Sequence, residues 1–172
     1  RAHPDDIELG CGATLLQAAN QGASITLLVL TDGRLGPGDP KLRAREQRRA
    51  AQQLGADLVF GGFRDGELTA ATALIRCIEQ VLESVHPDLM FAHAAADSHQ
   101  DHRAAAEATI AAARMLSTVL HYETPSTLEF QPTVFTDIAG YVPAKLDLLR
   151  NHMSQVVGAR RRRAGARRDL RA

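Results

Sequence analysis

The sequence predicts an α/β domain of the Rossmann-like, three-layer type, in which helices cover both faces of a mostly parallel sheet. Short apolar segments alternate along the chain with segments of helical periodicity, which is the pattern of a parallel sheet with helical connections. The clearest apolar segment, residues 24–30, is continuous and rich in β-branched residues. Such a run is typical of a strand that is buried on both faces. We expect right-handed connections between the strands.

In the first half of the chain, glycine, proline and acidic residues mark the ends of the helices. Gly10 and Gly12 weaken the first predicted helix near its start, because glycine is a poor helix former. Asp39 is a good cap for a second helix, with Pro40 in its first turn and Gly55 at its end. The expected elements are helices over residues 8–20 and 39–54 and strands over residues 24–30 and 58–60.

In the second half, apolar residues at four-residue spacing predict an amphipathic helix. Leu74, Ile78 and Leu82 share one face of this helix, which Thr69 or Thr72 begins and the pair at 86–87 ends. We expect most histidines outside the motifs to be ordinary surface or strand residues, and His93 to be the one that could line a site. The amphipathic helix is expected to end near residue 85, and two further helices are expected over residues 100–115 and 143–154. Strands are expected over residues 89–92, 119–122 and 134–138.

The N-terminal stretch brings an imidazole and two carboxylates together within four residues. His3, Asp5 and Asp6 stand beside a proline. Adjacent carboxylates raise each other's pKa unless a cation is present, and His with Asp is a ligand pair that Zn²⁺ accepts. Asp5 or Asp6 could instead cap the following helix, and this stretch alone leaves both interpretations open.

A second polar cluster of similar composition favours the metal hypothesis. His99 and His102 are three residues apart near the start of a predicted helix, so both rings can point to one side of its first turn. Capping would explain Asp97, Ser98 and Asp101, but it does not explain the histidines. The second cluster follows a predicted strand and the first would follow a strand missing from this sequence, and the carboxyl ends of parallel strands form the ligand edge of such sheets. We therefore expect one shared site.

These residues carry a family resemblance. The stretch 2–6, Ala-His-Pro-Asp-Asp, together with the His-x-Asp-His of 99–102, resembles the zinc-dependent N-acetylglucosaminyl deacetylases, known as the PIG-L or LmbE-like family. The resemblance runs from Ala2 to about Gln155. It includes three further stretches, Thr31-Asp32-Gly33, Gly61-Gly62-Phe63-Arg64-Asp65-Gly66 and Tyr122-Glu123-Thr124-Pro125-Ser126.

The resemblance implies a metal-assisted deacetylation of N-acetylated amino sugars and their conjugates. It assigns the metal to His3, Asp6 and His102, with Zn²⁺ as the expected ion and Fe²⁺ or another divalent cation as alternatives. A catalytic zinc keeps three protein ligands and an open position for water.

The same resemblance implies the catalytic roles. Asp5 becomes the general base, His99 the acid that protonates the leaving amine, and Asp101 the carboxylate that orients an imidazole, by our interpretation that of His99. The candidate sugar contacts are Arg45, Arg64 and Asp32.

The ends of the chain depart from the family pattern. Similar proteins have a hydrophobic strand directly before the first motif, so we expect a fragment whose deacetylase-like α/β domain spans 1–157 and lacks its first strand. We expect the Arg-rich tail, 158–172, to be disordered. Residues 160–172 hold seven of the twenty Lys and Arg and one of the twenty Asp and Glu, which leaves thirteen basic against nineteen acidic residues in the body. An acidic body gives no footprint for nucleic acid.

Two other function classes stay open on these observations. Two histidines and a carboxylate also form the facial triad of non-haem iron oxygenases, although the close His-x-Asp spacing on a β-barrel that is usual in those enzymes is missing here. A non-catalytic paralogue that binds nucleic acid through the Arg-rich tail is the other alternative. We expect a cytoplasmic protein with a small-molecule substrate and no membrane span, because the sequence has no run of about eighteen apolar residues. Homo-oligomerisation is left open.

Overall fold

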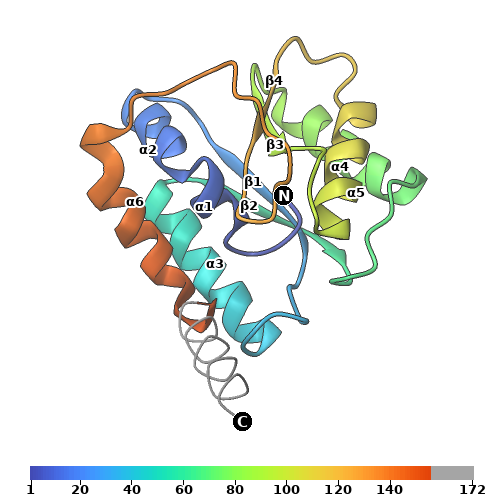
Figure 1. Ribbon diagram of the computed structural model, residues 1–172, viewed down its shortest axis with the longest axis horizontal. Coiled ribbons are helices and arrows are strands. Elements are labelled where there is room, and N and C mark those ends of the chain that lie inside the picture. The colour runs from blue at the N-terminus through green and yellow to red at the C-terminus, as the bar shows by residue number, and fades with distance from the viewer. Residues whose placement is uncertain (156–172) are drawn as a thin grey trace.

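In a computed structural model, residues 1–155 are described and form an α/β domain (Figure 1). Residues 158–172, for which we expected a disordered tail, lie outside the described part. The elements are α1 (Asp6–Gly10), α2 (Gly12–Asn20), β1 (Thr26–Thr31), α3 (Pro40–Leu54), β2 (Asp57–Phe63), α4 (Thr72–Val85), β3 (Met90–His93), α5 (Gln100–Ala112), β4 (Val119–Tyr122), η1 (Ala139–Tyr141), α6 (Val142–Leu149) and η2 (Arg150–His152).

The strands form two parallel pairs, β1 with β2 and β3 with β4. The residues before the first motif lie between these pairs. Leu30 and Thr31 of β1 donate their backbone N–H groups to the carbonyl oxygens of Arg1 and Ala2, at 3.0 and 2.9 Å. The backbone N–H of Ala2 donates to Nε2 of His93, at the end of β3, at 3.1 Å. The chain entering the first motif is thus held by both strand pairs.

Helices pack on both faces of the strands (Figure 1). Leu27 and Leu30 of β1 are fully buried and belong to different core clusters, because residues three apart on a strand point to opposite faces. Leu30 packs with α4 and α5, whose contribution includes Ile78 and several buried alanines. Leu27 packs with α1, α2, α3 and α6, through residues such as Leu54 and Leu148. The predicted α/β fold class is confirmed.

The helix predicted over residues 8–20 is instead two helices that meet at Cys11. Cys11 has non-helical backbone angles, with φ at −109° and ψ at 12°, and the weak helix formers Gly10 and Gly12 flank it. A Cβ at Gly10 would overlap the ring of Tyr122. The glycine therefore allows the end of α1 to approach the end of β4 closely.

The strand predicted over 134–138 is wrong. These residues form no strand, and the side chains of Val134 and Phe135 are 60% and 81% exposed. The apolar composition resembles that of a strand, but no described strand pairs with this segment. His152, which we expected at the surface, is buried beside Glu8, with Nε2 and Oε2 3.7 Å apart. Within residues 1–155, no helix combines the length and the apolar character needed to cross a bilayer.

Gly10→Ala is expected to destabilise the fold, since its methyl group has to displace the ring of Tyr122. Overpacking of this kind costs about 1 to 3 kcal/mol, which urea denaturation would measure. Gly12→Ala is the matched control, because the nearest atom to its Cβ, in Leu148, is 3.4 Å away. Equal unfolding free energies for the two variants would contradict the close approach of α1 and Tyr122.

Candidate metal centre

The two sequence motifs meet at the carboxyl ends of the strands. His3 follows the residues bonded to β1, His93 ends β3, and His99 and His102 lie at the start of α5. The ring centroid of His102 is 5.2 Å from that of His3, 4.7 Å from that of His99 and 4.0 Å from that of His93. The fold therefore brings residues about a hundred positions apart into one buried cluster.

The first turn is shaped around the carboxylate of Asp6. The backbone N–H of His3 donates to Asp6 Oδ2 at 2.7 Å. Asp5 has a φ of 95°, a region that residues other than glycine rarely adopt. Asp5 directly precedes α1, but its side chain makes no capping hydrogen bond. Helix capping therefore does not account for the acidic pair, and backbone strain of this kind is often found at functional sites.

The second motif is ordered by the start of α5. Asp97 Oδ1 accepts a hydrogen bond from the His99 backbone N–H at 2.7 Å. His99 is the capping residue, and its Nδ1 accepts from the Asp101 N–H at 3.2 Å. We expected Asp97 or Ser98 in the capping position. The shift by one or two residues leaves His99 and His102 on the same side of the first turn, as their spacing predicts.

Three possible metal-binding groups, on His3, Asp6 and His102, face one another. His3 Nδ1 lies 3.3 Å from His102 Nε2. The two oxygens of Asp6 lie 3.4 Å from these nitrogens, Oδ2 from His3 and Oδ1 from His102. A tetrahedral zinc with bonds of about 2.0 to 2.1 Å keeps its ligand atoms about 3.3 Å apart. The spacing of the two nitrogens fits two ligands of one zinc ion, and Asp6 faces each nitrogen with a different oxygen.

The outer nitrogens of the two rings contact carboxylates. His3 Nε2 is 3.1 Å from Asp101 Oδ2 and 3.0 Å from Asp65 Oδ1. His102 Nδ1 is 3.0 Å from Asp97 Oδ2. Because an ionised carboxylate only accepts hydrogen bonds, these contacts favour protons on the outer nitrogens and lone pairs on the inner ones. Lone pairs that converge beside a carboxylate suit a bound cation.

The charges around His3 are strongly coupled. Burial opposes protonation of this ring, but hydrogen bonds with Asp101, Asp6 and Asp65 raise the pKa of His3 to about 11. Burial likewise opposes ionisation of Asp101, but His3 and the backbone N–H of Gly66, which donates at 2.7 Å, lower the pKa of this carboxyl. The three carboxylates therefore favour a positive charge at His3. Without a metal this charge is the second ring proton, and a bound cation would take the place of that proton on the inner nitrogen.

His93 offers an alternative to His3 as a ligand. The described residues contain three sets of possible ligands, and within each set the ligand atoms lie within 4.8 Å of one another. The sets are His3 with His99 and His102, Asp6 with His93 and His102, and His3 with Asp65 and Asp101. His93 Nε2 is 3.2 Å from Asp6 Oδ2. The lone pair of this nitrogen, however, accepts the N–H of Ala2, so His3 is the more available ligand.

Asp5 lies beside this cluster with a different environment from that of Asp6. Burial and the charge of Asp6 raise the pKa of Asp5 to about 6, against the effect of Arg43. Arg43 Nη2 is 3.6 Å from Asp5 Oδ1 and donates to the carbonyl oxygen of Pro4 at 2.9 Å. Arg43 is 3% exposed and fills the space that Gly33, without a Cβ, leaves open.

The expectation that Asp101 orients the ring of His99 is wrong. The Asp101 carboxylate contacts His3 and accepts backbone N–H groups from Gly66 and Leu68, at 2.7 and 3.3 Å. Only its backbone N–H reaches the ring of His99. The reason is helical geometry, because side chains two residues apart do not face each other.

The three predicted sugar contacts lie outside the histidine cluster. Arg45 is exposed on α3, and Arg64 is exposed and 3.6 Å from Glu67. Asp32 follows β1 and pairs with Arg34, the carboxylate and guanidinium being 2.6 Å apart.

Three residues of the site were missed from the sequence. Asp65 directly follows Arg64 after β2 but was given no role, although its position at a strand end was a usable signal. Asp97 was explained as a cap. Thr124, whose hydroxyl donates to Asp97 Oδ2 at 3.0 Å, belongs to a segment for which the sequence suggested no function.

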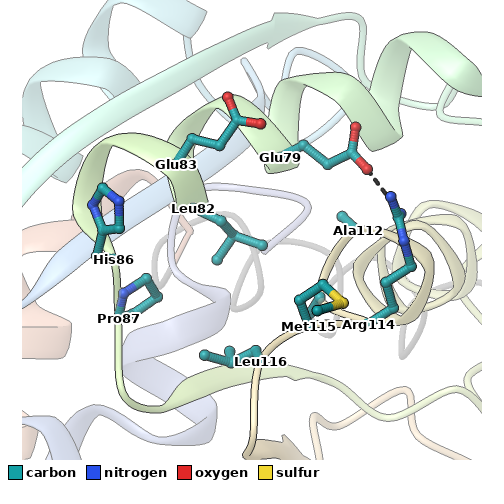
Figure 2. A pocket seen from close by; sticks show the side chains of 10 residues that line it. Glu79, Leu82, Glu83, His86, Pro87, Ala112, Arg114, Met115 and Leu116 are labelled. Carbon is teal, nitrogen blue, oxygen red and sulfur yellow. Dashed lines mark hydrogen bonds and ion pairs between the residues drawn. The ribbon is translucent and has the colours of Figure 1, made fainter.

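A separate surface pocket of about 420 Å³ lies between the C-terminal ends of α4 and α5 (Figure 2). Leu82, Met115 and Leu116 give it apolar walls, and Glu79 pairs with Arg114 at its edge, Oε1 and Nη1 being 3.0 Å apart. None of the residues predicted for the site lines this pocket.

Comparisons with known proteins identify the family of this chain. The family described as "PIG-L: GlcNAc-PI de-N-acetylase" matches residues 1–113. "Uncharacterized deacetylase YaiS" of Escherichia coli (strain K12) is 37% identical over 162 residues, covering 89% of this chain and 88% of that protein. "Probable N-acetyl-alpha-D-glucosaminyl L-malate deacetylase 2" of Bacillus anthracis is 30% identical over 179 residues, covering 89% of this chain and 78% of that protein.

A solved structure has the same fold as this chain. The conserved protein TT1542 from Thermus thermophilus superposes with a TM-score of 0.85 and 31% identity, covering 95% of this chain and 81% of that chain. Because the family match spans more than half of the sequence and the Escherichia coli relative aligns along most of both proteins, this chain belongs to the PIG-L family of de-N-acetylases.

Proposed function

We propose that this protein is a metal-dependent hydrolase that removes the acetyl group from an N-acetylated amino sugar or its conjugate. The observation that carries the proposal is the approach of His3 Nδ1 and His102 Nε2, 3.3 Å apart, to the Asp6 carboxylate, whose two oxygens each lie 3.4 Å from one of these nitrogens. Membership of the PIG-L family supports the reaction class. The name of the Bacillus anthracis relative, a deacetylase of an N-acetylglucosaminyl conjugate, supports the substrate class.

His3, Asp6 and His102 would hold the metal, with Zn²⁺ as the expected ion. Two imidazoles and one carboxylate match the ligands of catalytic zinc sites that keep a position open for water, and Fe²⁺ is the alternative ion. A bound metal of this kind polarises a carbonyl group and makes a water molecule more acidic.

Asp5 is the proposed general base. Its side chain is 18% exposed, so it borders the cluster without being closed off from water. Arg43 Nη2 is 3.6 Å from Asp5 Oδ1 and pairs with this carboxylate. In the reaction, the water oxygen bonds to the acetyl carbon, Asp5 takes the proton of that water, and the amide C–N bond breaks.

His99 is the proposed acid that completes the hydrolysis. Its Nδ1 accepts the backbone N–H of Asp101, which places the proton of the neutral ring on Nε2. Its ring centroid is 4.6 Å from that of His3 and 4.7 Å from that of His102. His99 would act in its imidazolium form, which gives one proton to the leaving amine beside the metal ligands and returns to the neutral ring. The proton that Asp5 takes from the water restores the imidazolium. Asp32, Arg45 and Arg64 are kept as the proposed sugar contacts.

The direct test of the function is acetate release from N-acetylglucosamine conjugates by the zinc-loaded protein. We expect stoichiometric acetate and free amine, with activity that a chelator abolishes and added Zn²⁺ restores. Activity that persists at full rate after complete metal removal would contradict the proposal. A zinc-loaded protein that hydrolyses none of a panel of N-acetyl amino-sugar conjugates would favour the non-catalytic alternative.

The metal assignment predicts which residues determine zinc content. His3→Ala, Asp6→Ala and His102→Ala should each lose bound zinc, measured by elemental analysis of purified protein, because three protein ligands are needed. His86→Ala is the control, since this exposed histidine follows α4, outside the cluster. His93→Ala should retain zinc. If His93→Ala loses the metal and His3→Ala keeps it, the ligand set is Asp6, His93 and His102 instead.

Asp5 and Asp6 are adjacent and chemically identical, so a matched pair of substitutions separates their roles. Asp5→Asn should keep zinc but lower kcat by about a hundredfold or more, because the amide cannot accept the proton of the water. Asp6→Asn should weaken zinc binding. Metal content and kcat measured on the same preparations would show reversed roles if Asp5→Asn loses zinc while Asp6→Asn retains it.

A further inference from the structure

The segment Thr124–Thr127, which follows β4, has no part in the proposed reaction, but its hydroxyl groups converge on one buried carboxylate. Thr124 and Thr127 each donate a hydroxyl to Asp97 Oδ2, at 3.0 and 3.2 Å. Ser126 Oγ lies 3.0 Å from Thr124 Oγ1 and 3.2 Å from His102 Nδ1. Asp97 itself is 1% exposed, so water does not replace these donors.

The backbone holds this segment against the residues that precede α5. Asp97 and Thr127 form an antiparallel bridge, and the N–H of Ser98 donates to the carbonyl oxygen of Ser126 at 2.9 Å. On the other side, Arg103 Nη1 donates to the Asp97 carbonyl oxygen at 2.7 Å. The position of Asp97 is therefore determined by β4 and its loop as well as by α5.

The two oxygens of the Asp97 carboxylate have different hydrogen-bond partners. Oδ1 accepts the N–H of His99 at 2.7 Å, and Oδ2 receives both threonine hydroxyls and lies 3.0 Å from His102 Nδ1. Since both threonine hydroxyls supply protons to Oδ2, this oxygen faces Nδ1 as an acceptor, and the ring supplies the proton. The lone pair of His102 is then on Nε2, the nitrogen that faces His3 and Asp6.

We propose that Asp97, held by the hydroxyl groups of Thr124 and Thr127, is a positioning residue that keeps His102 in the form that binds metal through Nε2. The loop after β4 thereby becomes part of the metal site without contributing a ligand. This inference rests on the proposed metal centre. Carboxylates that orient a ligating histidine raise metal affinity by about tenfold to a hundredfold, so its effect is measurable without an activity assay.

The test is the Zn²⁺ dissociation constant of the full chain, measured by competition with a chromophoric chelator. Asp97→Asn should raise Kd by about tenfold to a hundredfold. Thr124→Val, which keeps the shape but loses the hydroxyl, should raise Kd by about threefold or more, because a hydrogen bond to a charged group is lost. Thr124→Ser restores the hydroxyl and should recover the parent Kd. Thr109→Val, at a buried threonine within α5, is the control and should bind as the parent does.

Co²⁺ absorption spectra supply a second measurement that a purely structural role would not change. The visible bands of the Co²⁺-loaded protein should shift in Thr124→Val and return in Thr124→Ser. Unchanged Kd and spectra in both Asp97→Asn and Thr124→Val would overturn the inference, as would a Thr124→Ser variant that binds as weakly as Thr124→Val. A parent protein that binds Zn²⁺ no better than His102→Ala would instead overturn the metal centre itself.

Discussion

The structure of the site depends on one buried carboxylate, that of Asp6. Removing an ionised carboxylate from water costs several kcal/mol unless opposite charges and hydrogen bonds replace the water. Asp6 has the N–H of His3 at 2.7 Å and the rings of His93 and His102 within 3.4 Å. Burial opposes ionisation of Asp6, but the side chains of His102, His3 and His93 hold its pKa well below the usual value. With further carboxylates on the outer sides of His3 and His102, a cation at the centre is the arrangement that balances the charge.

The fold makes this concentration of charge tolerable by confining it to one end of the strands. The two core clusters on the faces of β1 consist mainly of leucine, isoleucine and alanine side chains, with Cys11 and Tyr122 in the second, so the polar groups gather where the strands end. Each loop at this end adds a different component. The first turn provides His3 and Asp6, the loop after β2 adds Asp65, and the residues between β3 and α5 add Asp97. The parallel arrangement of the strands therefore determines which loops can meet.

The fold class, the convergence of the two motifs and the pairing of His99 with His102 could be predicted, because periodicity and spacing carry that information. The weakness of the first helix near Gly10 and Gly12 was also visible in the sequence. The approach of Tyr122 to Gly10 and the burial of Arg43 against the Gly33 turn could not be predicted, since both depend on tertiary contacts. The strand expected over 134–138 failed for a related reason, because a strand needs a partner as well as a composition. In the site, Asp65 and Thr124 were missed because their roles arise from contacts 62 and 27 residues away, with His3 and Asp97.

Chemically identical residues of this site differ in role because the backbone directs them differently. The positive φ of Asp5 lets the next carboxylate turn inward to the histidines, while Asp5 itself stays partly exposed beside Arg43. Around α5, Asp97 precedes the helix and contacts His102, whereas Asp101 lies in its first turn and contacts His3. Each inner ring nitrogen thus has a carboxylate behind the opposite nitrogen of the same ring. Both carboxylates lie within three residues of the capping residue His99, so the conformation of this one helix start determines the direction of both.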